Sequence, residues 1–262
     1  MRKRTGVSWS HENFVIHEFE ELESTNSYAF DLMSSGKICD REVILANSQS
    51  EGRGRQRRKW HSPNGNLYFS LLLQTPIPVE KISQISFVTI VALRSAMEKI
   101  FFPQRKEFSI KNKWPNDLII NDRKVAGILV ESKVSQNISD FIVVGVGLNL
   151  ESSPDDAMFP AGSLKDFEVT MSRQNIVRNF LDEFDKFYQN WLSFGFAGIR
   201  NSWLSGAYRL GQEITVNQAN SMKGVFVGVD EAGNLLLERN GVVEVIISAD
   251  VGCDGRYDDR HT

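Results

Sequence analysis

The sequence predicts an α+β protein in which packed helices cover a mixed, largely antiparallel sheet, followed by a small C-terminal β-barrel. Three observations predict this class. The helical patterns are few and are separated by short apolar segments typical of strands. Residues 108–150 contain apolar runs that are too short for separate helices and are broken by turn residues. From Gly206 onward, short apolar stretches are joined by tight turns, which indicates a barrel of about fifty residues.

The first expected elements are a strand and a helix. Residues 13–23 alternate apolar and polar side chains, which is the pattern of a half-buried strand. Ser24-Thr25-Asn26 are good N-cap residues for a helix over 27–36, where Gly36 ends the apolar helical spacing. The next expected elements are strands at 42–50 and 67–75, and a long apolar helix at 79–102 that packs on the sheet.

The second half of the chain is expected to complete the sheet and add two helices. Residues 108–150 are broken at Pro115-Asn116-Asp117, Asn121-Asp122 and Asn137, which predicts a meander of antiparallel strands. Helical spacing returns at 172–194 and at about 197–204. The expected domains are a first domain at 1–205, a C-terminal β domain at 206–255 and a tail at 256–262.

Composition limits the classes of function. The chain has 262 residues, 41% hydrophobic and 24% charged, and its net charge of −3 favours no long-range attraction of polyanions. Cys39 and Cys253 lie far apart, and the four histidines lack ligand spacing, so we expect neither a disulfide framework nor dedicated metal ligands. The basic start has no apolar signal region and no apolar run reaches membrane-spanning length. We therefore expect a cytoplasmic protein without membrane contact.

The segment EGRGRQRRKWHSPNGN, residues 51–66, concentrates positive charge between glycines. Gly52 and Gly54 allow the backbone to come close to a ligand, and the planar guanidinium of arginine donates two parallel hydrogen bonds to phosphate or carboxylate. The segment could be a solvated surface loop, a nucleic-acid patch or a cradle for a small anion. It contains no GxxxxGK[ST] sequence, so it is not a Walker-type nucleotide site.

Four blocks of residues, in order and at the right spacing, resemble the biotin protein ligases, which attach biotin to a carboxylase carrier domain. The blocks are Glu23-Ser24-Thr25-Asn26; Gly52-Arg53-Gly54-Arg55 with Arg58, Trp60 and Ser62; Lys113-Trp114-Pro115-Asn116-Asp117 with Lys124 and Gly127; and Gly145-x-Gly147-x-Asn149. This resemblance implies a catalytic domain like that of the class II aminoacyl-tRNA synthetases at 1–205, and an SH3-like β domain at 206–255.

The resemblance also implies a two-step reaction. The biotin carboxylate attacks the α-phosphate of ATP, accompanied by Mg²⁺, and forms biotinyl-5′-AMP with release of pyrophosphate. A lysine of a biotin carboxyl carrier domain, part of an acyl-CoA carboxylase, then attacks the mixed anhydride and releases AMP. Because both partners in the first step are anions, the arginine-rich loop suits the task of holding them together.

The site residues implied by the resemblance fall into three overlapping sets. The expected catalytic residues are Lys124, Arg55 and Asp117. The expected biotin-binding residues are Ser24, Thr25, Asn26, Gln49, Gly52, Arg53, Arg55, Lys124 and Gly127. The expected ATP-binding residues are Arg55, Arg58, Trp60, Asn116, Asp117, Lys124 and Asn149. No dedicated metal ligands are expected; Mg²⁺ arrives with ATP, near Asp117, which either contacts that ion or orients the incoming amine.

Each assignment has a purely structural alternative. Residues 24–26 could be only a helix cap, Lys124 could be a surface hairpin lysine, and Trp60 could be a core aromatic. One position departs from the family pattern: Arg57 stands where relatives usually have glycine, which is expected to stiffen the loop and add charge.

Three other functions remain as alternatives. A lipoate–protein ligase shares the fold and the chemistry, but its acid has no ureido group. A DNA-binding repressor needs a winged helix of about sixty residues before the catalytic core, and Ser24 leaves no room for it, so we expect no DNA binding. A nucleic-acid-binding protein could use the arginines of 53–58. The protein is expected to be a monomer or a homodimer.

Overall fold

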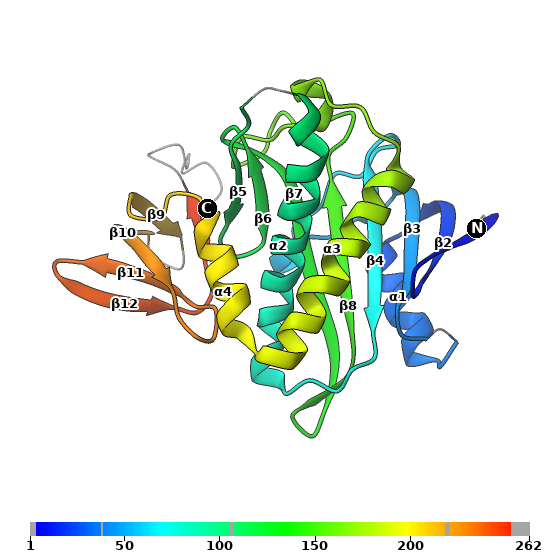
Figure 1. The fold of residues 1–262 in the computed structure, drawn as a ribbon, viewed down its shortest axis with the longest axis horizontal. Coiled ribbons are helices and arrows are strands. Elements are labelled where there is room, and N and C mark those ends of the chain that lie inside the picture. The colour runs from blue at the N-terminus through cyan, green and yellow to red at the C-terminus, as the bar shows by residue number, and fades with distance from the viewer. Residues whose placement is uncertain (1–3, 38, 105–106, 218–220, 253–262) are drawn as a thin grey trace.

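An eight-stranded sheet carries the larger part of the molecule, with strand order β1-β2-β3-β4-β8-β7-β6-β5 (Figure 1). The computed structural model describes residues 4–37, 39–104, 107–217 and 221–252. The strands are β1 (Arg4–His11), β2 (Phe14–Leu22), β3 (Glu42–Gln49), β4 (Leu67–Leu73), β5 (Ile110–Lys113), β6 (Asp117–Ile120), β7 (Arg123–Ser135) and β8 (Ile138–Leu148). Among the described residues, β2–β3 is the only parallel pair of strands in this sheet, so the predicted mixed, largely antiparallel sheet is confirmed.

The predicted meander lies at one side of this sheet. Strands β5 to β8 pair in sequence with antiparallel registers. Lys113 lies opposite Asp117, Asp117 lies opposite Gly127, and Gly127 lies opposite Gly147. Because side chains alternate across a strand, these registers bring residues that are distant in sequence onto one face of the sheet.

Helices cover both faces of the sheet. The helices are α1 (Thr25–Ser34), α2 (Ile82–Phe101), α3 (Arg173–Phe194) and α4 (Phe196–Ser205), with short 3₁₀ helices η1 (Arg55–Arg57), η2 (Val79–Lys81), η3 (Phe102–Gln104) and η4 (Leu164–Phe167). Helices α2 and α3 lie side by side over one face (Figure 1). Helix α1 packs on β3, β4 and β8 from the other face.

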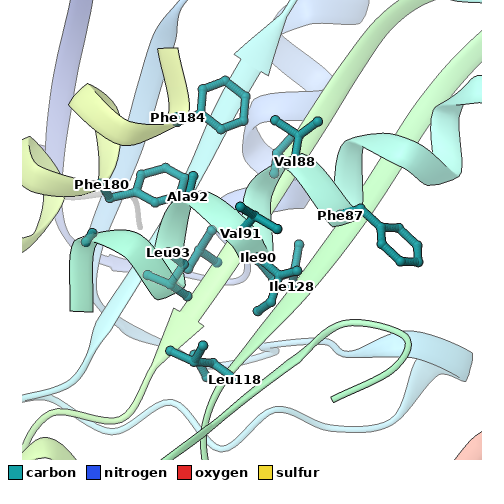
Figure 2. Packing of buried hydrophobic residues seen from close by; sticks show 14 of the residues in the cluster. Phe87, Val88, Ile90, Val91, Ala92, Leu93, Leu118, Ile128, Phe180 and Phe184 are labelled. Carbon is teal, nitrogen blue, oxygen red and sulfur yellow. The ribbon is translucent and has the colours of Figure 1, made fainter. Parts of the chain in front are cut away.

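The main core lies between the α2–α3 pair and the sheet. Figure 2 shows most of the labelled side chains of α2 between Phe180 and Phe184 of α3 and Ile128 and Leu118 of the sheet, whereas Phe87 points away from this group. The alternation along β3 divides the two layers, because Val43 and Leu45 join this core while Ile44 and Ala46 pack under α1. Fully burying one Val, Leu, Ile or Phe side chain contributes about 1.5–3 kcal/mol to the stability of the fold.

A second, five-stranded antiparallel sheet follows α4. Its strands are β9 (Glu213–Asn217), β10 (Ser221–Val229), β11 (Leu235–Arg239), β12 (Val242–Ile246) and β13 (Asp250–Gly252), in the order β12-β11-β10-β9-β13. Trp203 of α4 packs edge-to-face on Phe226, and the Trp114 indole donates a hydrogen bond to the Gly233 carbonyl at 2.9 Å. These contacts join the small sheet to the larger one.

The small C-terminal β domain predicted from the sequence is therefore present. The boundary predicted between residues 205 and 206 falls between α4 and β9 and stays a prediction. The predicted tail, 256–262, lies outside the described residues. Within the described ranges, no helix is both long enough and apolar enough to cross a membrane.

Strand β1 has no counterpart among the elements predicted from the sequence, the first of which begins at residue 13. It pairs with β2 in antiparallel register, with Trp9 opposite Ile16. The Trp9 indole donates to Glu18 at 2.6 Å and lies under the guanidinium of Arg178, 4.9 Å from the ring centroid. Such a polar edge strand is specified by pairing and tertiary contacts, and apolar alternation alone did not indicate it.

Candidate active site

A cavity of about 830 Å³ opens on the α1 side of the large sheet. Its walls come from the N-terminus of α1, the basic loop 51–66, the β5–β6 turn, strands β7 and β8, the segment 153–161, and Asp250 of the C-terminal sheet. Every site residue predicted from the sequence lines this cavity except Gly52. The blocks that are scattered along the chain are thus brought to one place.

The first wall is a chain of hydrogen bonds from α1 to the basic loop. The Ser24 hydroxyl accepts from the Ser27 amide at 3.4 Å, which confirms the predicted N-cap. Gln49 Oε1 accepts from the backbone amide and the hydroxyl of Thr25, at 2.8 and 3.2 Å, and Gln49 Nε2 donates to the Ser62 hydroxyl at 2.9 Å. Ser24 and Thr25 are buried, so this polar wall is held in a fixed geometry.

Asn26 is bound on all sides by the protein. Its Oδ1 accepts from the Ser70 hydroxyl at 2.6 Å, and its Nδ2 donates to Glu131 at 2.9 Å and to the Leu129 carbonyl at 3.2 Å. A Cβ at Gly145 would lie 2.2 Å from the Asn26 oxygen, so that position admits only glycine. The predicted biotin contact of Asn26 stays a prediction; the structure shows it as a support for the start of α1.

The basic loop folds back on itself as an irregular hairpin. The Trp60 amide donates to the Gly52 carbonyl and the Gly54 amide donates to the Arg58 carbonyl, both at 2.8 Å. An antiparallel backbone β-bridge also pairs Arg53 with Lys59. Gly52 is buried, and its carbonyl oxygen is occupied by the hydrogen bond from the Trp60 amide.

The loop tip has left-handed backbone conformations. Gln56 has φ 54° and Arg57 has φ 59°. Glycine is the residue best suited to this region, so Arg57 holds, at a conformational cost of about 1 kcal/mol, a shape that glycine takes without cost. Arg57 does not line the cavity, so its added charge lies outside it.

The other arginines of the loop are bound by protein partners. Arg53 donates to Ser27 at 3.0 Å and to Glu131 at 3.2 Å. Arg58 forms an ion pair with Asp250 of β13. The arginines therefore tie the loop both to α1 and to the C-terminal sheet.

Arg55 extends from the loop toward the C-terminal sheet. Its guanidinium donates to the Ser248 hydroxyl at 3.3 Å and lies 3.5 Å from the Ala249 carbonyl. Burial lowers the pKa of Arg55, while the nearby charges of Asp250 and Asp117 oppose that shift. Since arginine titrates far above neutral pH, the side chain stays a cation that is partly stripped of water.

A second group of charges surrounds Asp117, the first residue of β6. Lys124 Nζ lies 2.7 Å from Asp117 Oδ1, and Lys113 Nζ lies 3.6 Å from Asp117 Oδ2. Burial alone would raise the pKa of Asp117, but the charges of Lys124, Lys113 and Arg55 and the hydrogen bond from Lys124 outweigh it and hold the pKa below its ordinary value. Asp117 is therefore an ionised counter-ion shared by two lysines.

Asp117 should make the stability of the fold sensitive to acid. Because its folded pKa is depressed, its contribution is complete above the ordinary pKa and is lost as pH falls through the folded pKa. We expect the unfolding free energy of the wild type to fall more steeply below about pH 4 than that of Asp117→Asn. Urea unfolding at several pH values measures this, and parallel curves for the two proteins would contradict it.

Trp60 is seated on a pair of glycines. Gly127 and Gly147 lie opposite each other on β7 and β8, and a Cβ at Gly147 would lie 2.5 Å from the Trp60 indole nitrogen. Lys124 Nζ lies 5.3 Å from the centroid of the indole ring. Because the two glycines have no side chains, the Trp60 ring can lie directly against the backbone of β7 and β8. The predicted roles of Trp60 over the adenine and of Gly127 beside biotin stay predictions.

Replacing Gly147 with alanine should force the indole off this seat. Overpacking of this kind costs about 1–3 kcal/mol of unfolding free energy. In a Trp60→Ala background the added methyl group has no ring to displace, so there we expect the cost to fall below about 1 kcal/mol. Thermal and urea unfolding of the wild type, the two single variants and the double variant give the coupling free energy between the two positions. Equal costs in both backgrounds would show that Trp60 is not seated there.

Asn116 and Asn149 hold the turns that frame the cavity. Asn116 Nδ2 donates to the Ile128 carbonyl at 2.5 Å, which ties the β5–β6 turn to β7. Asn149 is buried, and its Nδ2 donates to the Gly162 carbonyl at 3.1 Å, which holds the segment after β8. Both line the cavity, and their predicted contacts with ATP stay predictions.

Some parts of the cavity wall are not among the site residues predicted from the sequence. Lys113 lay inside a recognised block but was given no role. The segment 153–161 has no regular pattern, and Asp250 lies 192 residues from Arg58. Nothing in a single sequence signals the last two. Among the residues with described positions, no three His, Cys, Asp or Glu side chains form a group that could hold a metal ion, and Asp117 is already paired with two lysines.

Comparisons with known proteins show to which family the chain belongs. Residues 18–149 match the model of the biotin/lipoate A/B protein ligase family, and residues 210–251 match the biotin protein ligase C-terminal domain. The bifunctional ligase/repressor BirA of Bacillus subtilis (strain 168) is 31% identical over 250 residues, covering 92% of this chain and 74% of that protein. The biotin–[acetyl-CoA-carboxylase] ligase of Paracoccus denitrificans is 34% identical over 236 residues, covering 87% and 96%.

A solved structure shows the same architecture. The biotin protein ligase from Aquifex aeolicus, in complex with biotin and ATP, superposes with a TM-score of 0.76 at 26% identity and covers 90% of this chain and 97% of that one. The fold and the site thus define an enzyme of the ligase class. The chain belongs to the biotin/lipoate A/B protein ligase family and carries the C-terminal domain of the biotin protein ligases.

Proposed function

We propose that this protein activates biotin with ATP as biotinyl-5′-AMP and transfers the biotinyl group to a lysine of a biotin carboxyl carrier protein. The observation that carries the proposal is the convergence of Lys124, Arg55 and Arg58 on one cavity that the fixed polar wall also lines. Relatives named as biotin ligases, and a solved relative in complex with biotin and ATP, support the same reaction.

In the first step a biotin carboxylate oxygen bonds to the α-phosphorus as the bond to pyrophosphate breaks. Both reactants are anions, so their approach is opposed by repulsion that the protein must cancel. We assign Lys124, which lines the cavity, to the carboxylate and the α-phosphate, and Arg55 and Arg58 to the phosphates. A partly buried cation such as Arg55 attracts an anion in the cavity more strongly than it would in water, because the local dielectric constant is lower.

The polar wall formed by Ser24, Thr25 and Gln49 is assigned to the ureido ring of biotin. That ring has fixed donors and an acceptor, and the wall holds hydroxyl and amide groups in a fixed arrangement. A site built this way rejects an acid that lacks these groups, since its buried polar atoms would lose their partners. This favours biotin over lipoate, and so does the match of residues 210–251 to the C-terminal domain of biotin ligases.

In the second step the amine of the carrier lysine attacks the acyl carbon, an amide forms and AMP leaves. Both carboxylate oxygens of Asp117 lie near lysines, so we assign it the role of counter-ion in the charged group. The two roles left open by the sequence, contact with Mg²⁺ and orientation of the amine, are less well supported by this geometry. No step is assigned to Mg²⁺, which accompanies ATP.

The remaining features of the proposal concern partners and location. The protein partner is the biotin carboxyl carrier domain of an acyl-CoA carboxylase, and the enzyme acts in the cytoplasm as a monomer or a homodimer. Nucleic-acid binding is disfavoured, because Arg53, Arg55 and Arg58 line one cavity of about 830 Å³ together with a fixed polar wall, which suits a small anion better than a long polyanion. The catalytic domain is assigned to 1–205 and the C-terminal domain to 206–255.

ATP–pyrophosphate exchange tests the proposal directly. The purified protein should exchange label between ATP and pyrophosphate with biotin and not with lipoate, and mass spectrometry should then show one biotinyl group on a carrier domain. Exchange with lipoate alone would make the protein a lipoate ligase. Tight, salt-sensitive binding of nucleic acid without any exchange would favour the nucleic-acid-binding alternative.

A further inference from the structure

Lys113 is a buried lysine beside the charged centre. It is the last residue of β5, is only 6% exposed, and lines the cavity. Its Nζ lies 3.6 Å from Asp117 Oδ2 and 4.8 Å from the centroid of the Phe159 ring. An ammonium group is costly to bury, so its place here calls for a reason beyond packing.

The two lysines that share Asp117 differ in their access to the cavity. The Lys124 side chain is 26% exposed, whereas the Lys113 side chain is 7% exposed. They approach different oxygens of the carboxylate, Lys124 at Oδ1 and Lys113 at Oδ2. Lys124 is therefore the cation that can turn toward an incoming anion, and Lys113 is the cation that stays.

We propose that Lys113 is a positioning residue that keeps Asp117 neutralised while Lys124 leaves it for the reacting carboxylate and phosphate. If Lys124 were the sole partner of Asp117, its departure would leave an uncompensated buried carboxylate. Lys113 avoids that cost, because its own ion pair with Asp117 remains when Lys124 turns to the substrate anions. Arg55 contributes at longer range to the charge around Asp117 and has its own partners on the C-terminal sheet.

This inference rests on the proposed function, and its effect should appear in the rate of the first step. We expect Lys113→Met to lower kcat for biotin-dependent ATP–pyrophosphate exchange by about tenfold to a hundredfold, with KM for biotin changed by less than about threefold. Lys113→Arg keeps the charge beside Asp117 and should stay within about fivefold of the wild type. Lys113→Gln serves as a second neutral variant if the methionine variant does not fold.

The decisive comparison uses a Lys124→Ala background, measured in single turnovers. Because Lys113 acts through Lys124, Lys113→Met should there lower the residual rate by less than about threefold. The same fold loss in both backgrounds, a wild-type kcat for both neutral variants, or an arginine variant as slow as them, would overturn the inference. A wild-type protein that shows no biotin-dependent exchange would instead refute the proposed function itself.

Discussion

Replacing Lys124 with alanine should lower the rate of biotin adenylation by about 10²–10³. The side chain projects from β7 at the centre of the charged group, 2.7 Å from Asp117 and 5.3 Å from the Trp60 ring centroid. It is the lysine whose exposure allows it to reach both reacting anions. Losing it removes a cation where negative charge is concentrated in the transition state and leaves Asp117 with Lys113 as its remaining ion-pair partner.

Lys133→Ala is the matched control for this prediction. Lys133 lies on the same strand, is exposed, and does not line the cavity, so its loss should change the rate by less than about twofold. Quenched-flow measurement of adenylate formation compares the two variants with the wild type. A Lys124→Ala enzyme with wild-type kinetics would reject the assignment of Lys124.

Replacing Arg55 with alanine should cause the second large loss, again about 10²–10³ in the adenylation rate. Arg55 is a partly desolvated cation that lines the cavity and reaches Ser248 and Ala249, which connect β12 to β13 of the C-terminal sheet. The substitution removes both a phosphate contact and one of the bonds that hold the loop against that sheet. We therefore expect KM for ATP to rise as kcat falls.

Arg57→Ala separates this effect from a general loss of positive charge on the loop. Arg57 belongs to the same loop, lies outside the cavity, and has the same formal charge. Its replacement should leave the adenylation rate within about twofold of the wild type. Equal losses in Arg55→Ala and Arg57→Ala would mean that the loop acts through its net charge.

Much of the fold could be predicted because its local signals are strong. Ser24 caps α1, as its side-chain oxygen and the apolar spacing behind it indicate. The turn residues between 108 and 150 correctly predicted the antiparallel meander β5 to β8. Strand β1 had no such signal, since it is a polar edge strand held by β2 and by Arg178 of α3.

The candidate site was predicted as a set of residues more readily than as a geometry. All the site residues proposed from the four blocks and Gln49, except Gly52, line the cavity. The contacts that these site residues make with one another could not be predicted from the sequence. The Gly127–Gly147 register that seats Trp60, and the contact of Asp250 with Arg58, depend on strand pairing and on docking of the C-terminal sheet.

A crystal structure of this protein with biotin and a non-hydrolysable ATP analogue tests the central claim most directly. We predict Lys124 Nζ within about 3.2 Å of both the biotin carboxylate and the α-phosphate, Arg55 on the phosphate, and Lys113 still paired with Asp117. A ligand bound elsewhere, or a basic loop turned into solvent with Lys124 still held by Asp117, would contradict this account of the site.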